Sequence, residues 1–227
     1  MQGIRLLSSV VRASSVTRWL VVLALLLQSC RTCELPPSTK AIKFERGSVV
    51  LATVRTRNEH RIDNRLVVTS LKFRQVSPTG QTTTRQALVG GQPWTTDGDS
   101  GRVGWYAAQL PPGRHRLIQI AGRGEMLLAP GHFEWPVDHE FELAPETVLD
   151  LGEFVLVNRT RTGDEERSGG IFPLIDQAVS GFAASTIDLL LQPPGESAGA
   201  EHRRHYKALS ALSVSPHVAL PAPPEAP

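Results

Sequence analysis

The chain has 227 residues, of which 41% are hydrophobic and 20% charged, and its formal net charge at pH 7 is +2. This length allows one domain of ordinary size with a substantial core. A nearly neutral chain without a basic stripe argues against a nucleic-acid partner.

The first 29 residues are typical of an export signal. Arg5, Arg12 and Arg18 give the chain a basic start, and the apolar run 19–27 follows them. A helix needs about 20 apolar residues to cross a bilayer. This run has roughly half as many, which matches the apolar region of a signal peptide. We therefore predict a signal peptide over residues 1–29.

The end of the apolar run, Leu27-Gln28-Ser29-Cys30, resembles the lipobox of bacterial lipoproteins, although Gln28 is bulkier than the residue usual at that position. The resemblance implies that Cys30 carries a diacylglyceryl thioether, becomes the first mature residue and is then acylated on its amine, as with palmitate. Several acyl chains hold a protein firmly, at about 0.8 kcal/mol per buried methylene. The alternatives are an ordinary secretory cleavage and an uncleaved short anchor.

Arg31 follows the predicted lipidation site. In enteric lipoproteins an aspartate at this position retains the protein at the inner membrane. The resemblance therefore implies an outer-membrane location facing the periplasm, for a Gram-negative source. If Cys30 is lipidated, Cys33 has no partner for an internal disulfide. The C-x-x-C spacing of the two cysteines lacks the strand and helix start expected around a redox motif.

The sequence divides the mature chain into four parts. Residues 30–45 are short, polar and rich in proline, and they predict a tether. Residues 46–158 predict the β-sandwich domain. A loop and a C-terminal helical segment are expected over residues 159–212, and a disordered tail rich in proline and alanine over residues 213–227.

The domain contains short apolar and β-branched segments that are separated by turn residues. Leu71 and Phe73, for example, alternate with Lys72 and Arg74, as expected for a half-buried strand. The predicted strands are 48–54, 65–74, 81–88, 104–110, 114–120, 125–128, 138–143 and 148–157. The last is the most apolar and is expected to be central. This pattern predicts a mainly β fold, an antiparallel β-sandwich with one or two C-terminal helices.

Pro111-Pro112-Gly113 predicts a tight hairpin, because proline presets the first central position and glycine supplies a positive φ. The segment 110–117 is similar to the hairpin of transthyretin-like and carboxypeptidase-regulatory-like sandwich domains. The segment 141–152 is similar to a strand pair that lies downstream of that hairpin in bacterial lipoproteins. His115 or Arg116 stands where the family has an aromatic residue. The resemblance implies a sandwich fold and no particular activity.

The C-terminal part shows a helical pattern. Apolar residues spaced by three and four predict an amphipathic helix over residues 173–191, with Pro173 at its start. We expect this helix to pack across an edge of the sandwich, and a partner-binding or membrane-lying helix is the alternative. A second short helix is expected over residues 201–212.

Gly98-Asp99-Ser100-Gly101 resembles the nucleophile loop of chymotrypsin-like proteases. That chemistry needs a histidine base and a buried aspartate. His60 and Asp63 precede Ser100 but lack the flanking residues of that family, and Arg102 replaces its second glycine. We therefore predict no catalytic residue.

Acidic and histidine side chains are candidate metal ligands. Asp97 and Asp99 fit the start of an EF-type loop, but Ala108 stands where a bidentate acid is required. The candidate histidines are His132, His139, His202 and His205. Arg203 and Arg204 lie between the last two and would repel a cation. We expect solvated surface histidines, and neither a metal nor another cofactor.

Trp94, Tyr106 and Trp135 are candidate residues for stacking on a sugar or peptide. Trp105 and Tyr106 are adjacent in a predicted strand, so one points into the core and the other is expected to be at least partly exposed. Ordinary core packing is the alternative explanation for all of these aromatic residues.

These features favour a non-enzymatic envelope lipoprotein that is anchored in the membrane through Cys30 and binds an envelope protein or another envelope component. A carbohydrate- or peptidoglycan-fragment-binding sandwich is the second hypothesis, and it predicts a groove lined by Trp94, Trp135 or Tyr106. An envelope hydrolase is the third, and it predicts a pocket where a histidine meets Ser100 or an acidic pair.

Overall fold

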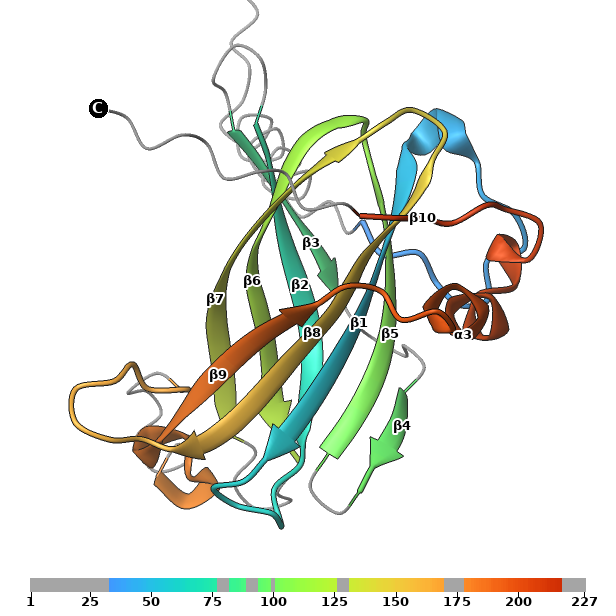
Figure 1. The fold of residues 1–227 in the computed structure, drawn as a ribbon. Helices are drawn as coiled ribbons and strands as arrows, with labels where there is room; N and C mark the ends of the chain where they lie inside the picture. The colour runs from blue at the N-terminus through green and yellow to red at the C-terminus, as the bar shows by residue number, and fades with distance from the viewer. Residues whose placement is uncertain are drawn as a thin grey trace, which may run out of the picture. The chain divides into compact units, whose positions relative to one another are not determined.

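Two β-sheets pack face to face in the part of the chain that the structure describes (Figure 1). The structure is a computed structural model, and it describes residues 33–76, 82–88, 94–98, 101–125, 131–169 and 178–217. The predicted signal peptide, Cys30 and the last ten residues of the predicted tail lie outside these ranges. The described residues confirm the predicted class, a β-sandwich with short C-terminal helices.

Sheet A has four strands in the order β3–β2–β6–β7. All of its neighbouring strands pair antiparallel. The bounds of its strands are Leu66–Val76 for β2, Thr82–Leu88 for β3, Gly113–Gly124 for β6 and His132–Leu143 for β7.

Sheet B has the order β10–β8–β1–β5–β4, and β9 also pairs with β8. The bounds of its strands are Ser48–Asn58 for β1, Trp94–Asp97 for β4, Gly101–Leu110 for β5, Val148–Thr160 for β8, Ser185–Gln192 for β9 and Ser215–Pro216 for β10. Most pairs are antiparallel, but β1 and β10 both run parallel to β8. The strand β8, predicted to be central, is an interior strand of this sheet.

The main core lies between the sheets, and strand β1 shows how the sequence divides between its two faces. Val50 and Ala52 point into the main core. Val49 and Leu51 point the opposite way, into a second apolar cluster on the outer face of sheet B. A strand that is buried on both faces needs a continuous apolar run instead of an alternating one, and the sequence of β1 supplies it.

The second cluster is covered by the C-terminal segment and by the residues before β1. The covering elements are the α-helix α3 (Ala198–His205) and the short 3-10 helices η3 (Lys207–Leu209) and η1 (Phe44–Arg46). Tyr206 and Leu209 are fully buried in this cluster, and Ile42 and Phe44 pack against it. Among the residues that the structure describes, no helix has the length and hydropathy needed to span a membrane.

The predicted hairpin at Pro111-Pro112-Gly113 is wrong. Strand β5 belongs to sheet B and β6 to sheet A, so the turn carries the chain from one sheet to the other. Neither proline has an N–H to donate across a two-strand ladder. Gly113 has φ +124°, which an L side chain rarely adopts, so the positive φ expected of this glycine is present in a different kind of turn.

The predicted helix over residues 173–191 is wrong in its C-terminal part. Residues 178–180 are helical and residues 170–177 lie outside the described ranges, but Ser185–Gln192 forms strand β9. Thr186 and Ile187 are β-branched residues, which favour an extended chain. The 3-10 helix η2 (Phe182–Ala184) leads into this strand, and Phe182 is buried in the main core.

Two predicted flexible segments are also corrected. Residues 33–45 do not form a free tether, because Cys33 and Leu35 are buried and Leu35 N–H donates to the carbonyl oxygen of Ala107 at 2.9 Å. Residues 213–217 do not belong to a disordered tail, because β10 pairs with β8 and His217 N–H donates to the carbonyl oxygen of Asp150 at 2.7 Å.

Candidate functional site

A pocket of about 140 Å³ lies between the outer face of sheet B and the start of α3. Its walls combine an aromatic ring, an arginine and two carboxylates. The lining residues that matter here are Thr53, Arg55, Trp105, Glu153, Ala198 and Glu201. Strands β1, β5 and β8 supply the floor, and α3 with the segment before it supplies one wall. This volume is that of a site for a small ligand or for one side chain of a partner.

The position of α3 over the sheet is fixed by three contacts. Tyr206 Oη donates a hydrogen bond to the carbonyl oxygen of Trp105 at 2.7 Å. The rings of Trp105 and His205 stack with their centroids 4.2 Å apart. His202 Nε2 lies 3.3 Å from Thr53 Oγ1 in a buried contact. The wall that α3 contributes is therefore part of the packed structure.

The close approach of β8 to the end of β9, beside the pocket, requires glycine at position 152. Gly152 has φ +97°, and a Cβ added there would lie 2.3 Å from the carbonyl oxygen of Gln192. It lies where the pairing of β1 with β8 shifts register, between Leu51 and Thr53. Such irregularities bend a strand and change the direction of its side chains, and here they place Glu153 on the pocket.

Arg55 is the charged centre of the pocket. Its Nε donates to Glu153 Oε1 at 2.6 Å, and its Nη1 donates to Asp97 Oδ2 at 2.6 Å. Burial lowers the pKa of Arg55, but the hydrogen bonds to Asp97 and Glu153 outweigh burial and raise this pKa overall. The arginine therefore stays charged and is held between two carboxylates, which is an arrangement for orienting a polar group.

His202 lies next to the pocket but remains neutral. Burial lowers its pKa to about 4, and the nearby His205 adds to this shift. Its side chain is fully buried, and Nδ1 has no hydrogen-bond partner among the described residues. The ring therefore acts as a packing and hydrogen-bonding group near neutral pH.

The predicted surface histidines are partly corrected. His202 is fully buried and His139 is only 8% exposed, so neither is a solvated surface residue. His132 is exposed and His205 half-buried. Within the described ranges, no group of three or more His, Cys, Asp or Glu side chains lies close enough to hold a metal ion.

The three predicted stacking residues lie in different environments. Tyr106 is buried in the main core, so its ring is not available to a ligand. Trp135 is half-buried and packs against the same core from sheet A. Trp94 is 49% exposed on β4, and the Arg102 guanidinium carbon lies 3.4 Å from its ring centroid. Since Tyr106 is enclosed, these three residues do not line one groove.

Trp105 and Tyr106 point to opposite faces of sheet B, as predicted for neighbours in a strand. The expectation that one of them is at least partly exposed is wrong, because Trp105 is only 8% exposed. The helix α3 and the ring of His205 cover it. A sequence pattern shows that a strand face is apolar but does not show which later segment covers it.

The remaining predicted site residues are placed as follows. Cys30 with Leu27, Gln28 and Ser29 lies outside the described residues, as do Asp99 and Ser100. Asp97 forms ion pairs with Arg55 and Arg57, which oppose a cation there. His60 Nδ1 lies 2.9 Å from Thr160 Oγ1, and Asp63 pairs with Arg61. His60 therefore joins the β1–β2 connection to the end of β8, and Asp63 pairs within that connection.

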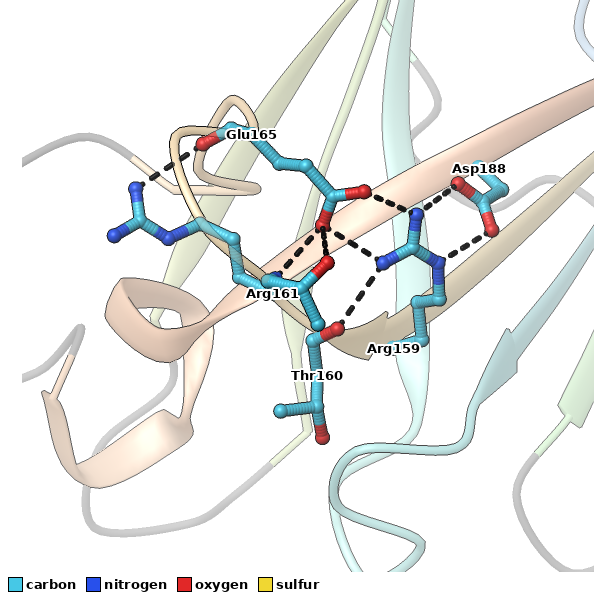
Figure 2. Close-up of polar contacts among 6 residues, drawn as sticks. Arg159, Thr160, Arg161, Glu165 and Asp188 are labelled. Atoms are coloured by element: carbon cyan, nitrogen blue, oxygen red, sulfur yellow. Dashed lines mark hydrogen bonds and ion pairs between the residues drawn. The ribbon is translucent and has the colours of Figure 1, made fainter.

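A dense polar cluster closes the β8–β9 connection, as Figure 2 shows. Arg159 makes paired hydrogen bonds to Glu165, at 2.7 and 2.9 Å, and to Asp188, at 2.7 and 3.0 Å. The hydrogen bonds from Arg159, followed by those from Thr162, lower the pKa of Glu165 to about 2. The partners lie at the end of β8, on β9 and in the segment 161–165 that follows β8, so we interpret this cluster as a structural clasp.

The pocket beside α3 is the site that sequence patterns missed. Arg55, Glu153 and Glu201 come from three elements that are far apart in the chain. Their one local signal is a pair of arginines, Arg55 and Arg57, that follow the apolar run of β1. That signal does not reveal its partners, because the β1–β8 pairing is parallel and spans about a hundred residues.

No protein-family model matches the chain, and no curated protein matches it. Among solved structures, the chain is similar to that of a "putative cell adhesion protein" from Bacteroides fragilis, with 6% sequence identity and a TM-score of 0.33. The match covers 65% of this chain and 46% of the other, so this chain spans less than half the length of that protein. A similarity of this size does not establish a common fold or activity.

Proposed function

We propose that this chain is a lipid-anchored binding module of the bacterial cell envelope. It is held in the outer membrane through Cys30 and acts by contact with an envelope protein or another envelope component, without catalysis. The signal-like start of the chain and the resemblance of residues 27–30 to a lipobox support the anchor. The burial of Cys33, three residues later, supports a domain that begins close to the anchored residue.

The arrangement of the pocket beside α3 is the observation that supports the proposed binding role. Arg55 is fixed by Glu153 and Asp97, and α3 is fixed on the sheet by Tyr206. The side chains whose pKa values burial shifts most, such as Cys33 and Tyr206, are packed in apolar clusters and do not line the pocket. Catalytic sites usually place such groups in the pocket, so this pocket suits recognition.

Membrane fractionation with mass spectrometry tests the anchor. We expect the wild-type protein to be found in the outer-membrane fraction with the mass of a triacylated chain that begins at Cys30. Cys30→Ser should leave the chain unacylated and outside that fraction, whereas Cys33→Ser should leave the anchor intact. Identical mass and fractionation of wild type and Cys30→Ser would contradict the proposal.

Photo-crosslinking in intact cells tests the binding site. A photoreactive residue at Ser197, on the pocket lining, should give a discrete crosslinked product. Ala198→Trp should fill the pocket and remove this product. Ala200→Trp is the matched control, because Ala200 is exposed on the same helix and does not line the pocket. Equal products from both tryptophan variants would exclude the pocket as the binding site.

A further inference from the structure

Strand β5 shares one of its edges between two segments that are distant in the chain. Its residues 101–104 pair with β4, and Trp94 stands opposite Gly104. Further along the same edge, Glu34 stands opposite Ala108 in an isolated antiparallel bridge. The start of the domain and strand β4 therefore lie along the same edge of sheet B.

Cys33 is fixed at this edge by backbone hydrogen bonds to both sheets. Gln109 N–H donates to the carbonyl oxygen of Cys33 at 2.7 Å, which ties it to β5. Cys33 N–H donates to the carbonyl oxygen of Gln86 at 3.3 Å, which ties it to β3 in sheet A. The place where the chain enters the domain is thus defined.

The reach of the predicted anchor follows from chain length. Three residues span at most about 11 Å, so Cys30 lies no further than that from Cys33. Ala108 and Gly104 are four residues apart on β5, which corresponds to about 14 Å along a strand. Acylation at Cys30 would therefore hold the start of the domain near the lipid headgroups, and Trp94 lies about 14 Å further along the same edge of sheet B.

Trp94 has the chemistry of a residue at a membrane interface. It is 49% exposed, whereas the other tryptophans of the described residues are buried or half-buried. One face of its ring is covered by the guanidinium of Arg102, whose charge is paired with Glu125. Tryptophan is enriched at the headgroup level of membranes, where an amphipathic ring is favoured.

The distribution of charge along the sheet edges supports the same orientation. The exposed residues of β3 and β4 are uncharged, namely Thr82, Thr83, Thr84, Gln86, Trp94, Thr95 and Thr96. Asp97 at the end of β4 is paired with Arg55. At the opposite edge of sheet A, β7 exposes Glu134, Asp138 and Glu142. Anionic lipid headgroups repel carboxylates, so the neutral edge is the one suited to face them.

We propose that the edge formed by β3, residues 33–35 and β4 lies against the lipid headgroups, with Trp94 at the interface and β7 turned away. This inference rests on the proposed lipid anchor at Cys30. It assigns the domain a defined orientation on the membrane and leaves the pocket beside α3 and the β8–β9 connection free for other contacts.

Tryptophan fluorescence of the lipidated protein tests this orientation. The protein is reconstituted in phosphatidylethanolamine–phosphatidylglycerol vesicles that contain lipids with a nitroxide on the headgroup. Trp135→Phe and Trp94→Phe form a matched pair, because each loses one tryptophan and each keeps the buried Trp105. We expect the variant that retains Trp94 to be quenched at least about twofold more strongly than the variant that retains Trp135.

A flotation assay separates this inference from the proposed anchor. If Cys30→Ser floats with vesicles as well as wild type does, the proposed anchor is wrong. The proposed orientation, which depends on that anchor, is then wrong as well. If flotation requires Cys30 but Trp135 is quenched as strongly as Trp94, or more strongly, the anchor stands and the orientation is overturned. Equal thermal unfolding of the two variants shows that both retain the fold.

Discussion

Tyr206 donates a hydrogen bond of 2.7 Å from Oη to the carbonyl oxygen of Trp105, a residue 101 positions earlier in the chain. This bond and the burial of both side chains join the C-terminal segment to the outer face of sheet B. The segment after β9 is therefore held against sheet B, where it forms one wall of the candidate pocket.

We expect Tyr206→Phe to lower the free energy of unfolding by about 1 kcal/mol, because the ring is kept but a buried hydrogen bond is lost. Tyr206→Ala should cost about 3–5 kcal/mol, because it also leaves a cavity in the second cluster. Urea unfolding followed by circular dichroism measures both. Lys207→Ala, at an exposed neighbour, is the control and should change stability by less than about 0.5 kcal/mol. A Tyr206→Ala variant as stable as wild type would show that α3 does not depend on this cluster.

Arg55 allows a prediction about the electrostatics of the pocket. Arg55→Gln leaves Asp97 and Glu153 without their cation, and we expect it to cost about 1–2 kcal/mol, a figure reduced because all three side chains are partly exposed. Arg204→Gln is the control, because Arg204 is mostly exposed and pairs with Glu201 within one helix. The loss for Arg55→Gln should shrink in high salt, since added ions screen the two carboxylates. A loss no larger than that of the control would mean that the pair is not needed to hold the pocket.

The fold class was predictable because the signals for it are local. The strand β2 shows alternating apolar and charged residues, and β1 shows an apolar run, so each was expected within a few residues of its observed bounds. What could not be predicted is which strands are partners. Pro111-Pro112-Gly113 is a turn whether the next strand returns in the same sheet or crosses to the other, and only the packing of the whole domain decides between these outcomes.

The candidate site was less predictable for the same reason. His202 was expected at the surface because arginines follow it, yet it is buried because its side of α3 lies on β1. Ser185–Gln192 has apolar residues at helical spacing, but β8 offers a free edge that an extended segment can pair with. In both cases long-range contacts outweigh the local sequence pattern: side-chain packing buries His202, and strand pairing extends Ser185–Gln192.

Loss of the clasp should loosen the β8–β9 connection without lowering the stability of the whole domain. Glu165→Gln removes the charge that pairs with Arg159 and weakens the acceptor that Thr162 N–H uses at 2.8 Å. We expect trypsin to cut faster after Arg161 and Arg167, with little change in melting temperature, because Arg159 and Glu165 lie at the surface. Glu146→Gln, at an exposed turn, is the control. Unchanged cleavage in Glu165→Gln would show that the connection is ordered by other contacts.

The thiol of Cys33 offers a test that also reports on the anchor. Burial raises the pKa of Cys33 to about 12, and a buried neutral thiol is a poor nucleophile. We expect no reaction of the native protein with a thiol reagent at pH 8, and one reactive thiol per chain after unfolding. Two thiols after unfolding would mean that Cys30 carries no thioether, whereas a thiol that reacts in the native protein would contradict the packing of residues 33–35 against β5.

The buried histidines predict the response of the protein to mild acid. Burial lowers the pKa of His139 to about 4, with His217 adding to the shift and Asp138 opposing it. Burial likewise lowers the pKa of His202 to about 4. In the unfolded chain both titrate near pH 6.5, so the unfolded state binds protons first as the pH falls. Their contribution to stability is complete above pH 6.5 and is lost progressively down to about pH 4.

Asp150 works against this trend but does not cancel it. Burial raises the pKa of Asp150 to about 6, against an opposing hydrogen bond from Gly152 N–H. The folded protein therefore takes up a proton on Asp150 first, and stability rises as the pH falls from about 6 toward 3.8. Burial also lowers the pKa values of three further histidines, His115, His205 and His217, so we expect a net loss of stability between pH 6.5 and 4.5.

Melting temperatures across this range measure the effect. His202→Gln keeps a side chain that can bond to Thr53 Oγ1 but cannot be protonated, so it should reduce the loss of stability between pH 6.5 and 4.5. His132→Gln, at an exposed position, should leave the pH profile of wild type unchanged. The range above pH 4.5 separates the histidines from Glu165, whose hydrogen bonds with Arg159 hold its pKa at about 2 and whose contribution is lost only at lower pH. A profile of His202→Gln that follows wild type would show that His202 is not buried as a neutral ring, and the wall of the pocket beside α3 would then need another origin.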